Sequence, residues 1–217
     1  ILQDRAAAGR RLVEPLLQYA RRSDVIVLAL PRGGVPVAYE VAMALEVRLD
    51  LMLVRKLGAP SNEEFALGAI ASGGIQILND HALRAHPIDQ ATFDAVVARE
   101  TRELLRREQA YRGAREPVPL KDQVVILIDD GLATGASMMA AIQAVRLQAP
   151  SRIVVAVPVA PIETVEALRS EVDELICPVV PDWFMSLGHW YMDFSQTSDA
   201  EVIKLLQRAW HREADIE

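Results

Sequence analysis

Two adjacent carboxylates follow directly on an apolar run in the stretch VVILIDDGLATGAS, residues 124–137. The five aliphatic residues 124–128 predict a buried strand, so Asp129 and Asp130 stand at its end and are too polar for a core. The small-residue loop 131–135 lets backbone amides approach a ligand closely. The pattern therefore predicts a ligand that offers hydroxyls to the carboxylates and a phosphate to the loop.

A helix expected over 135–148 supports the phosphate half of this prediction. The first turn of a helix presents unpaired N–H groups and a partial positive charge, and Thr134 and Ser137 add hydroxyl donors. The loop is not a Walker A loop, because no lysine follows its last glycine, and the dinucleotide pattern G-x-G-x-x-G is absent. A turn capped by acids, without a ligand, is the alternative explanation.

The stretch ALPRGGVPVA, residues 29–38, adds a second candidate anion site. A strand is expected to end there and a helix to follow, with Arg32, Gly33 and Gly34 between them. Small residues expose backbone amides, and the arginine supplies one fixed positive charge. An ordinary strand–helix turn explains this motif equally well when it is taken alone.

Two cations in LVRKLGAP, residues 53–60, form a third candidate. Arg55 and Lys56 are expected to follow a strand, where a solvated pair of cations is also common. The polar loop 59–64 could close over a neighbouring site. Its Glu63 or Glu64 could contact a cation or a base, and simple exposure to solvent is the alternative.

Five of the eleven aromatic residues lie within fourteen positions, in PDWFMSLGHWYMDF, residues 181–194. Such a cluster either forms a small satellite core or offers flat faces on which a planar base can stack. The four histidines show no metal-ligand spacing. Cys177 lies in an apolar run and is predicted to be an inert buried thiol.

The elements that must position these residues alternate along the chain as short apolar runs and helix-period stretches. This order predicts an α/β domain with a mostly parallel sheet flanked by helices, in which ligands bind beyond the carboxyl ends of strands. The strands are expected over residues 25–30, 49–54, 124–128, 153–157 and 174–177. The helices are expected over residues 5–21, 34–45, 89–111, 135–148, 162–170 and 200–211.

Residues 58–116 are expected to be an insertion between two core strands. Two apolar runs over 67–78 flank a pair of glycines and predict a hairpin. The long helix over 89–111 is amphipathic, with an Arg/Glu-rich face typical of a solvated surface with pairs such as Glu103–Arg107. That face could also pack in a dimer.

The composition limits the classes of protein to consider. A chain of 217 residues with 51% hydrophobic residues fits one folded domain. Its apolar runs are far shorter than the ~20 residues of a membrane span, and its charged first residues do not resemble a signal peptide. A net charge of −7 argues against general nucleic-acid binding. A single cysteine excludes an internal disulfide and favours a cytoplasmic location.

The stretch VVILIDDGLATGAS resembles the ribose-5-phosphate signature of the type I phosphoribosyltransferases, in which an apolar run and two acids precede a T-G-x-S/T loop. The resemblance implies an α/β core, a flexible loop, a C-terminal hood (residues 178–198), and binding of 5-phosphoribosyl-1-pyrophosphate (PRPP) with Mg²⁺. Asp129 and Asp130 would take the ribose hydroxyls and contact the metal through water or through PRPP. The residues around the 5-phosphate would be Ala133, Thr134, Gly135, Ala136 and Ser137.

The same resemblance implies roles for the two upstream motifs. Arg32, Gly33 and Gly34 would form the pyrophosphate loop. Lys56, oriented by Arg55, would reach the same group.

The hood motif resembles that of the 6-oxopurine phosphoribosyltransferases through its P-D-x-F-x-x-x-G spacing. Phe184 would then stack on the base, and Asp193 would bind an exocyclic group or Mg²⁺. Beyond Gly188 the spacing departs by about one residue. The purine-reading lysine of those enzymes has no counterpart in the apolar run 153–161, so the acceptor base stays open.

The activity implied is that of a Mg²⁺-dependent, dimeric transferase that moves ribose 5-phosphate from PRPP to a nitrogenous base and releases pyrophosphate. A purine of nucleotide metabolism is one candidate for that base. Arg32, Lys56, Asp129 and Asp130 would carry this chemistry. Two alternatives are a regulatory protein of the same fold that senses PRPP or a nucleotide, and a phosphohydrolase with Asp129 as nucleophile.

Overall fold

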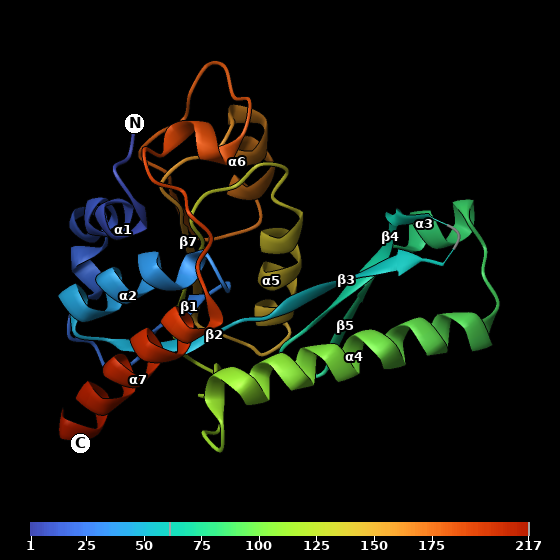
Figure 1. Ribbon diagram of the computed structural model, residues 1–217, viewed down its shortest axis with the longest axis horizontal. Helices are drawn as coiled ribbons and strands as arrows, with labels where there is room; N and C mark the ends of the chain where they lie inside the picture. Colours follow the sequence, from blue (N-terminus) through green and yellow to red (C-terminus); the bar gives the residue numbers. More distant parts are fainter. Residues whose placement is uncertain (61, 217) are drawn as a thin grey trace.

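The computed structural model describes residues 1–60 and 62–216 and has a five-stranded parallel sheet at its centre (Figure 1). The strand order is β2-β1-β6-β7-β8, so β1 and β6 are neighbours although about a hundred residues separate them. These strands are β1 (Val25–Ala29), β2 (Arg48–Leu51), β6 (Val124–Ile128), β7 (Arg152–Ala156) and β8 (Glu174–Ile176).

Helices cover both faces of this sheet, as the alternation of side chains along each strand requires. On β1, Val25, Val27 and Ala29 face one hydrophobic cluster, and Ile26 and Leu28 face the other. The first cluster is covered by α1 (Arg5–Val13), α2 (Gly34–Leu45) and α7 (Asp199–Ile216), the second by α5 (Ala136–Arg146) and α6 (Ile162–Arg169) (Figure 1). The predicted α/β class is confirmed.

The direction in which the chain adds successive strands to the sheet reverses between β1 and β6. From β1 the chain passes through α2 to β2 on one side, and from β6 it passes through α5 to β7 on the other. In open α/β sheets this reversal leaves a crevice at the carboxyl ends of the two strands, where ligands bind. The loops that carry the two glycine-containing motifs both lie there.

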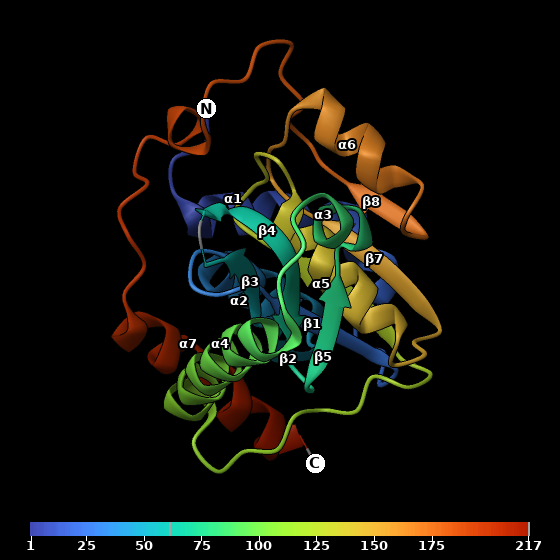
Figure 2. The same ribbon diagram turned by 90° about the vertical axis from the view of Figure 1, so that its right-hand side faces the viewer.

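An arm, residues 54–112, leaves the sheet after β2 and projects from the body in Figure 1. Its antiparallel sheet packs against α4 and, on its other face, against α5 of the body (Figure 2). Within it, Gly73 and Gly74 form the expected hairpin turn with φ values of 91° and 73°. The arm consists of β3 (Val54–Ala59), β4 (Asn62–Ala71), β5 (Ile75–Leu78), α3 (Asp80–Ala85) and α4 (Gln90–Arg112).

A buried ion pair ties the arm to the central sheet. Arg112, the last residue of α4, bonds Asp50 of β2, and both side chains are almost fully buried. Asp50 also accepts hydrogen bonds from the backbone N–H groups of Leu51 and Val118, at 2.8 and 2.9 Å. Helix α7 covers the free edge of β2. The backbone N–H of Leu49 donates a hydrogen bond to the Glu213 carboxylate, and the Leu49 carbonyl accepts one from the indole N–H of Trp210.

Three predicted elements need correction. The strand expected over 49–54 is two strands in different sheets, β2 and β3, because the chain leaves the central sheet at Met52 and Leu53. The first helix changes at Glu14 into a 3₁₀ helix, η1 (Glu14–Tyr19), where Pro15 cannot donate a backbone hydrogen bond. Helix α3 was not expected, and α7 extends five residues beyond its predicted end to Ile216.

The remaining helices and the remaining strands of the central sheet agree with their predicted ranges within two residues, and α2 and β6 agree at both ends. In the hairpin predicted over 67–78, β4 begins five residues earlier than expected, at Asn62. Among the described residues, no helix combines the length and apolar character needed to cross a membrane.

Candidate functional site

The loops after β1 and β6 meet at the carboxyl edge of the sheet. Leu30 donates a backbone hydrogen bond to Ile128 at 3.0 Å, and the peptide bond between Pro31 and Arg32 is cis. A Cβ atom on Gly33 would lie 2.1 Å from Oδ2 of Asp130, and one on Gly34 would lie 2.9 Å from the Ile128 carbonyl oxygen. Glycine is thus required at both positions by close approach to the acidic loop.

The two carboxylates of that loop have different surroundings. Asp130 is buried, and its Oδ2 accepts a hydrogen bond from Nε of Arg5 at 2.9 Å. Asp129 is half-buried and lines a pocket, and its Oδ1 accepts from the backbone N–H of Asp130 at 2.8 Å. Burial, followed by the negative charge of Asp130, raises the pKa of Asp129 well above its ordinary value. A bound cation or hydroxyl donor would relieve that cost.

The loop 131–135, predicted to bind a phosphate, leads into α5 at Ala136, with Gly135 as N-cap at a φ of 78°. Gly135 has no side chain to cap the helix. Its backbone lies so close to Thr164 that a Cβ atom on Gly135 would be 2.8 Å from the Thr164 methyl group. The hydroxyl of Thr164 also donates to the carbonyl of Ala133. Gly135 is buried, whereas the four other predicted phosphate residues are exposed: Ala133, Thr134, Ala136 and Ser137. The helix N-terminus is therefore open to an anion.

A cationic pocket of about 130 Å³ adjoins these loops. Three guanidinium groups line it, from three separate elements, together with Asp129 and Ser137. Nη1 of Arg32 lies 3.7 Å from Oδ1 of Asp199, the first residue of α7. The same carboxylate oxygen accepts a hydrogen bond from the Tyr111 hydroxyl at 2.7 Å. The three arginines are Arg32 of the β1–α2 loop, Arg55 of β3 and Arg107 of α4.

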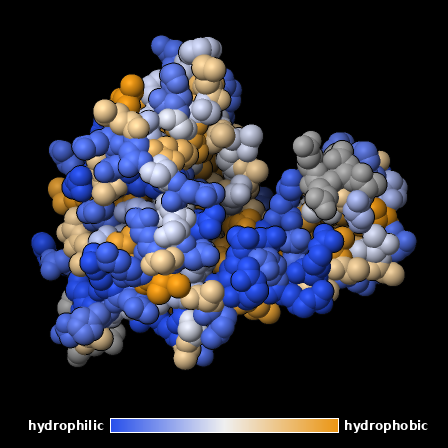
Figure 3. Space-filling view, in the orientation of Figure 1, coloured by the Kyte–Doolittle hydropathy of each residue, from blue (hydrophilic) through white to orange (hydrophobic). Residues whose placement is uncertain are grey.

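The two predicted cations of β3 point to opposite faces. The expectation that Arg55 and Lys56 follow a strand is wrong, since both lie within β3, where successive side chains alternate. Arg55 lines the cationic pocket, and Lys56 lines a second pocket of about 420 Å³ between the arm sheet and α5. The surface is hollowed between body and arm in Figure 3. Ser137 lines both pockets.

The hood, residues 178–198, packs directly on the acidic loop. The hydroxyl of Tyr191 donates to the backbone carbonyl of Asp130 at 2.6 Å. Gly131, at a φ of 146°, lies so close to Leu187 that a Cβ there would be 2.3 Å from Cδ2. The N-terminal segment joins the hood from the other side, because Leu2 donates to the carbonyl of Trp190 at 2.8 Å.

Most of the hood aromatics form a small core. Phe184 is half-buried and packs in a cluster with Leu2, Val159 and Tyr191, whereas Trp183 is 70% exposed. Asp193 is exposed, and hydrogen bonds from Ser195 lower its pKa. Base stacking by Phe184 and metal binding by Asp193 therefore stay predictions. Cys177 is half-buried, and burial raises the pKa of its thiol to about 11.

Three residues of the site were missed from the sequence. Arg5 lies in a predicted helix with many charges, Arg107 was assigned to the solvated face of the long helix, and Tyr111 is the last residue of that helix's predicted range. The Glu103–Arg107 pair exists, at 3.0 Å, but it does not keep Arg107 out of the pocket. The side chains of Glu63 and Glu64 lie outside the described part of the chain.

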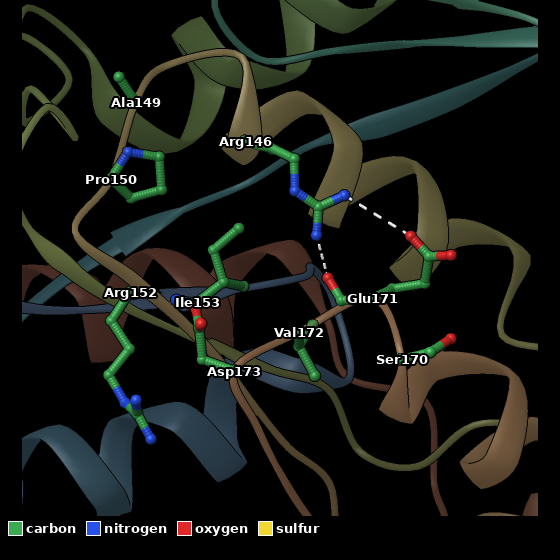
Figure 4. Close-up of a pocket in the computed structure, with 9 residues that line it drawn as sticks. All are labelled: Arg146, Ala149, Pro150, Arg152, Ile153, Ser170, Glu171, Val172 and Asp173. Atoms are coloured by element: carbon green, nitrogen blue, oxygen red, sulfur yellow. Dashed lines mark hydrogen bonds and ion pairs between the residues drawn. The ribbon is translucent and has the colours of Figure 1, made fainter.

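The described residues hold no group of three His, Cys, Asp or Glu side chains that could bind a metal alone. Asp129 fits a metal shared with a ligand, because Mg²⁺ commonly takes one or two carboxylates plus substrate phosphate oxygens. Another pocket lies at the amino end of β7 (Figure 4). Because the candidate site lies at the carboxyl edge of the sheet, this pocket is not part of it. Its Arg146 is paired with Glu171 at 3.5 Å, and the side chain of Arg152 points away from the other labelled residues (Figure 4).

Residues 1–194 match the family model of the phosphoribosyl transferase domain. A Mycobacterium tuberculosis protein, provisionally named a phosphoribosyl transferase, is 43% identical over 213 residues, which cover 98% of this chain and 48% of that protein. The chain thus spans about half the length of this curated relative.

Two solved structures share the fold. TT1426 from Thermus thermophilus has a TM-score of 0.83 and 44% sequence identity, covering 95% of this chain and 98% of that one. AQ2163 from Aquifex aeolicus has a TM-score of 0.52 with 13% identity, covering 85% and 78% of the two chains, and shows likeness of fold alone.

Proposed function

Because the chain belongs to the phosphoribosyl transferase family, we propose that it transfers ribose 5-phosphate from PRPP to a nitrogenous base and releases pyrophosphate. One observation carries this proposal. An open helix N-terminus, a pair of carboxylates and a cationic pocket lie side by side at the carboxyl edge of the sheet. A 5-phosphate, a ribose and a diphosphate occur in that order in PRPP.

Each group of PRPP has a proposed binding partner. The exposed residues of the loop 133–137 would bind the 5-phosphate through backbone amides and hydroxyls. Asp129 would accept hydrogen bonds from the ribose hydroxyls, and Asp130, fixed by Arg5, would hold the loop and complete the ribose site. Arg32 and Arg55 would bind the diphosphate, and Lys56 would reach a phosphate from the adjoining pocket.

The reaction breaks the bond from C1 of the ribose to the diphosphate oxygen while a base nitrogen bonds to C1. The bonding electrons leave with pyrophosphate, and the base gives up a proton. Positive charge develops on the ribose ring and negative charge on the leaving group, so Asp129 and the arginines would stabilise opposite ends of the transition state. Catalysis would be positional and electrostatic.

Mg²⁺ is proposed as the cofactor, held by Asp129 together with oxygens of PRPP. When bound, it would neutralise charge on the departing diphosphate. The raised pKa of Asp129 fits this role, because a cation would stabilise the half-buried carboxylate in its charged form.

Calorimetric titration of PRPP, with and without Mg²⁺, tests the proposal. Wild type should bind PRPP more tightly with Mg²⁺, and the double variant Asp129→Asn/Asp130→Asn should lose at least about a hundredfold in affinity, since two hydrogen-bonding charges are removed. Circular dichroism would show that the variant is folded. A folded wild type that does not bind PRPP would refute the proposal.

A panel of bases would then separate an enzyme from a sensor of the same fold. Release of pyrophosphate with one base, and not without it, is the expected result. Tight PRPP binding without turnover on any base would favour the regulatory alternative.

A further inference from the structure

Helix α4 of the arm presents a row of polar side chains toward the cationic pocket. Glu100, Glu103, Arg107 and Tyr111 are spaced by three, four and four residues. At 3.6 residues per turn this spacing places them within about 80° of one another on the helix. Arg107 and Tyr111 line the pocket itself. On the face seen in Figure 3, the surface over α4 is mostly hydrophilic.

This row holds two of the three guanidinium groups in place. Oε2 of Glu100 accepts a hydrogen bond from Nε of Arg55 at 2.7 Å, and Oε1 of Glu103 accepts from Nε of Arg107 at 3.0 Å. A guanidinium has five N–H donors. Because both contacts to glutamate use Nε, the terminal amino groups are the ones available to a ligand.

The chemistry of the pocket selects a small polyanion. Three arginines from separate elements line this pocket of about 130 Å³ together with Ser137, and arginine binds phosphate oxygens through two parallel hydrogen bonds. Burial and its hydrogen bond to Asp199 raise the pKa of Tyr111 to about 12, so its hydroxyl keeps its proton at neutral pH.

We propose that α4 forms one wall of the diphosphate site and that Arg107 binds the diphosphate of PRPP directly. Helix α4 would then join strand β3 of the same arm in forming the binding site. This inference rests on the proposed function, and it assigns a role to a residue that lies outside the two glycine-containing loops and the hood.

Arg106 provides a matched control for Arg107. Both arginines bond the same oxygen of Glu103, at 2.6 and 3.0 Å, and their side chains are 66% and 46% exposed. Only Arg107 lines the pocket. Arg106→Gln and Arg107→Gln therefore remove the same charge from the same partner, one outside the pocket and one inside it.

The experiment is calorimetric titration of inorganic pyrophosphate with Mg²⁺, and separately of ribose 5-phosphate, into wild type and both variants. Arg107→Gln should weaken pyrophosphate binding at least about tenfold and leave ribose 5-phosphate binding unchanged. Arg106→Gln should change neither. Arg107→Lys, which keeps the charge and loses the planar fork, should fall between wild type and Arg107→Gln. Thermal melting would verify that all variants fold.

Equal pyrophosphate affinities in the Arg106→Gln and Arg107→Gln variants would overturn the inference. Wild type that binds ribose 5-phosphate but not pyrophosphate would overturn it too, while the ribose-phosphate site would stand. Wild type that binds neither ligand would refute the proposed function and this inference together.

Discussion

The adjacent residues Asp129 and Asp130 have the same side chain but different surroundings. Asp130 is bonded by Arg5 and lies against Gly33, so its carboxylate is fixed by the protein. Asp129 faces the cationic pocket. The like charge of Asp130 adds to the burial that raises the pKa of Asp129. Carboxylates whose pKa is shifted by burial and a like charge cluster at functional sites, which supports the proposed ligand-binding role of Asp129.

The contact between Gly33 and Asp130 gives a residue-scale prediction. In Gly33→Ala the new methyl group would lie 2.1 Å from Oδ2 of Asp130, so the carboxylate must rotate away from Arg5. We expect a modest loss in the free energy of unfolding, about 1–2 kcal/mol, and a loss of PRPP affinity of at least about tenfold. Urea denaturation and calorimetry would measure the two effects.

Gly188→Ala is the control, because its methyl group would come no closer than 3.5 Å to Phe194. This variant should keep both stability and affinity. A Gly33→Ala protein that binds PRPP like wild type would show that the position of the Asp130 carboxylate does not matter for binding.

At the scale of elements, the sequence predicted well whatever is local. The ends of α2 and β6 were predicted from glycine, charge and aliphatic runs, and the loop between β6 and α5 was predicted from its small residues. The break at Met52 and Leu53 was missed because two apolar strands in succession show one continuous pattern, although they belong to different sheets. Contacts between distant segments, such as that of Arg5 with Asp130, leave no local pattern at all.

Arg5 joins three elements that are far apart in the chain. From α1 its guanidinium bonds Asp130 and the carbonyl of Ser195, and it stacks 4.2 Å from the centre of the Phe194 ring. Because Ser195 and Phe194 belong to the hood, the same side chain that fixes the acidic loop also fixes the hood. The two should therefore loosen together.

Arg5→Gln should speed amide hydrogen exchange in the hood, residues 178–198, and in the acidic loop, while exchange in β1 and α2 stays unchanged. The expected cost is about 1–3 kcal/mol of local stability, the usual effect of losing hydrogen bonds to a charged group. Hydrogen-exchange mass spectrometry would measure it. Arg10→Gln on the same helix removes only an exposed pair with Glu40, at 3.8 Å, and should change nothing. Unchanged exchange in the hood of Arg5→Gln would contradict this coupling.

At the scale of the whole molecule, the arm and the body share a core. Leu104 and Tyr111 of α4 belong to the same hydrophobic cluster as β1, α2 and α7. The end of α4 is fixed to β2 by the buried Arg112–Asp50 pair. If α4 carries part of the diphosphate site, this attachment determines where Arg107 stands relative to Arg32. We therefore expect the arm to unfold with the body.

Removing Arg112 tests this expectation, because it leaves the Asp50 carboxylate buried without its cation. Arg112→Ala should lower the free energy of unfolding by about 3–5 kcal/mol, and Arg112→Met with Asp50→Asn should recover part of that loss. Arg99→Gln, which removes an exposed arginine 3.4 Å from Glu100, should stay within about 0.5 kcal/mol of wild type.

In urea, circular dichroism and tryptophan fluorescence should give one coincident transition for each variant. All three tryptophans lie in the body, outside residues 54–112, so their fluorescence reports on the body alone. If the helical circular dichroism signal of Arg112→Ala were lost at a lower urea concentration than the fluorescence signal, the arm would unfold separately. The core would then not fix the position of Arg107.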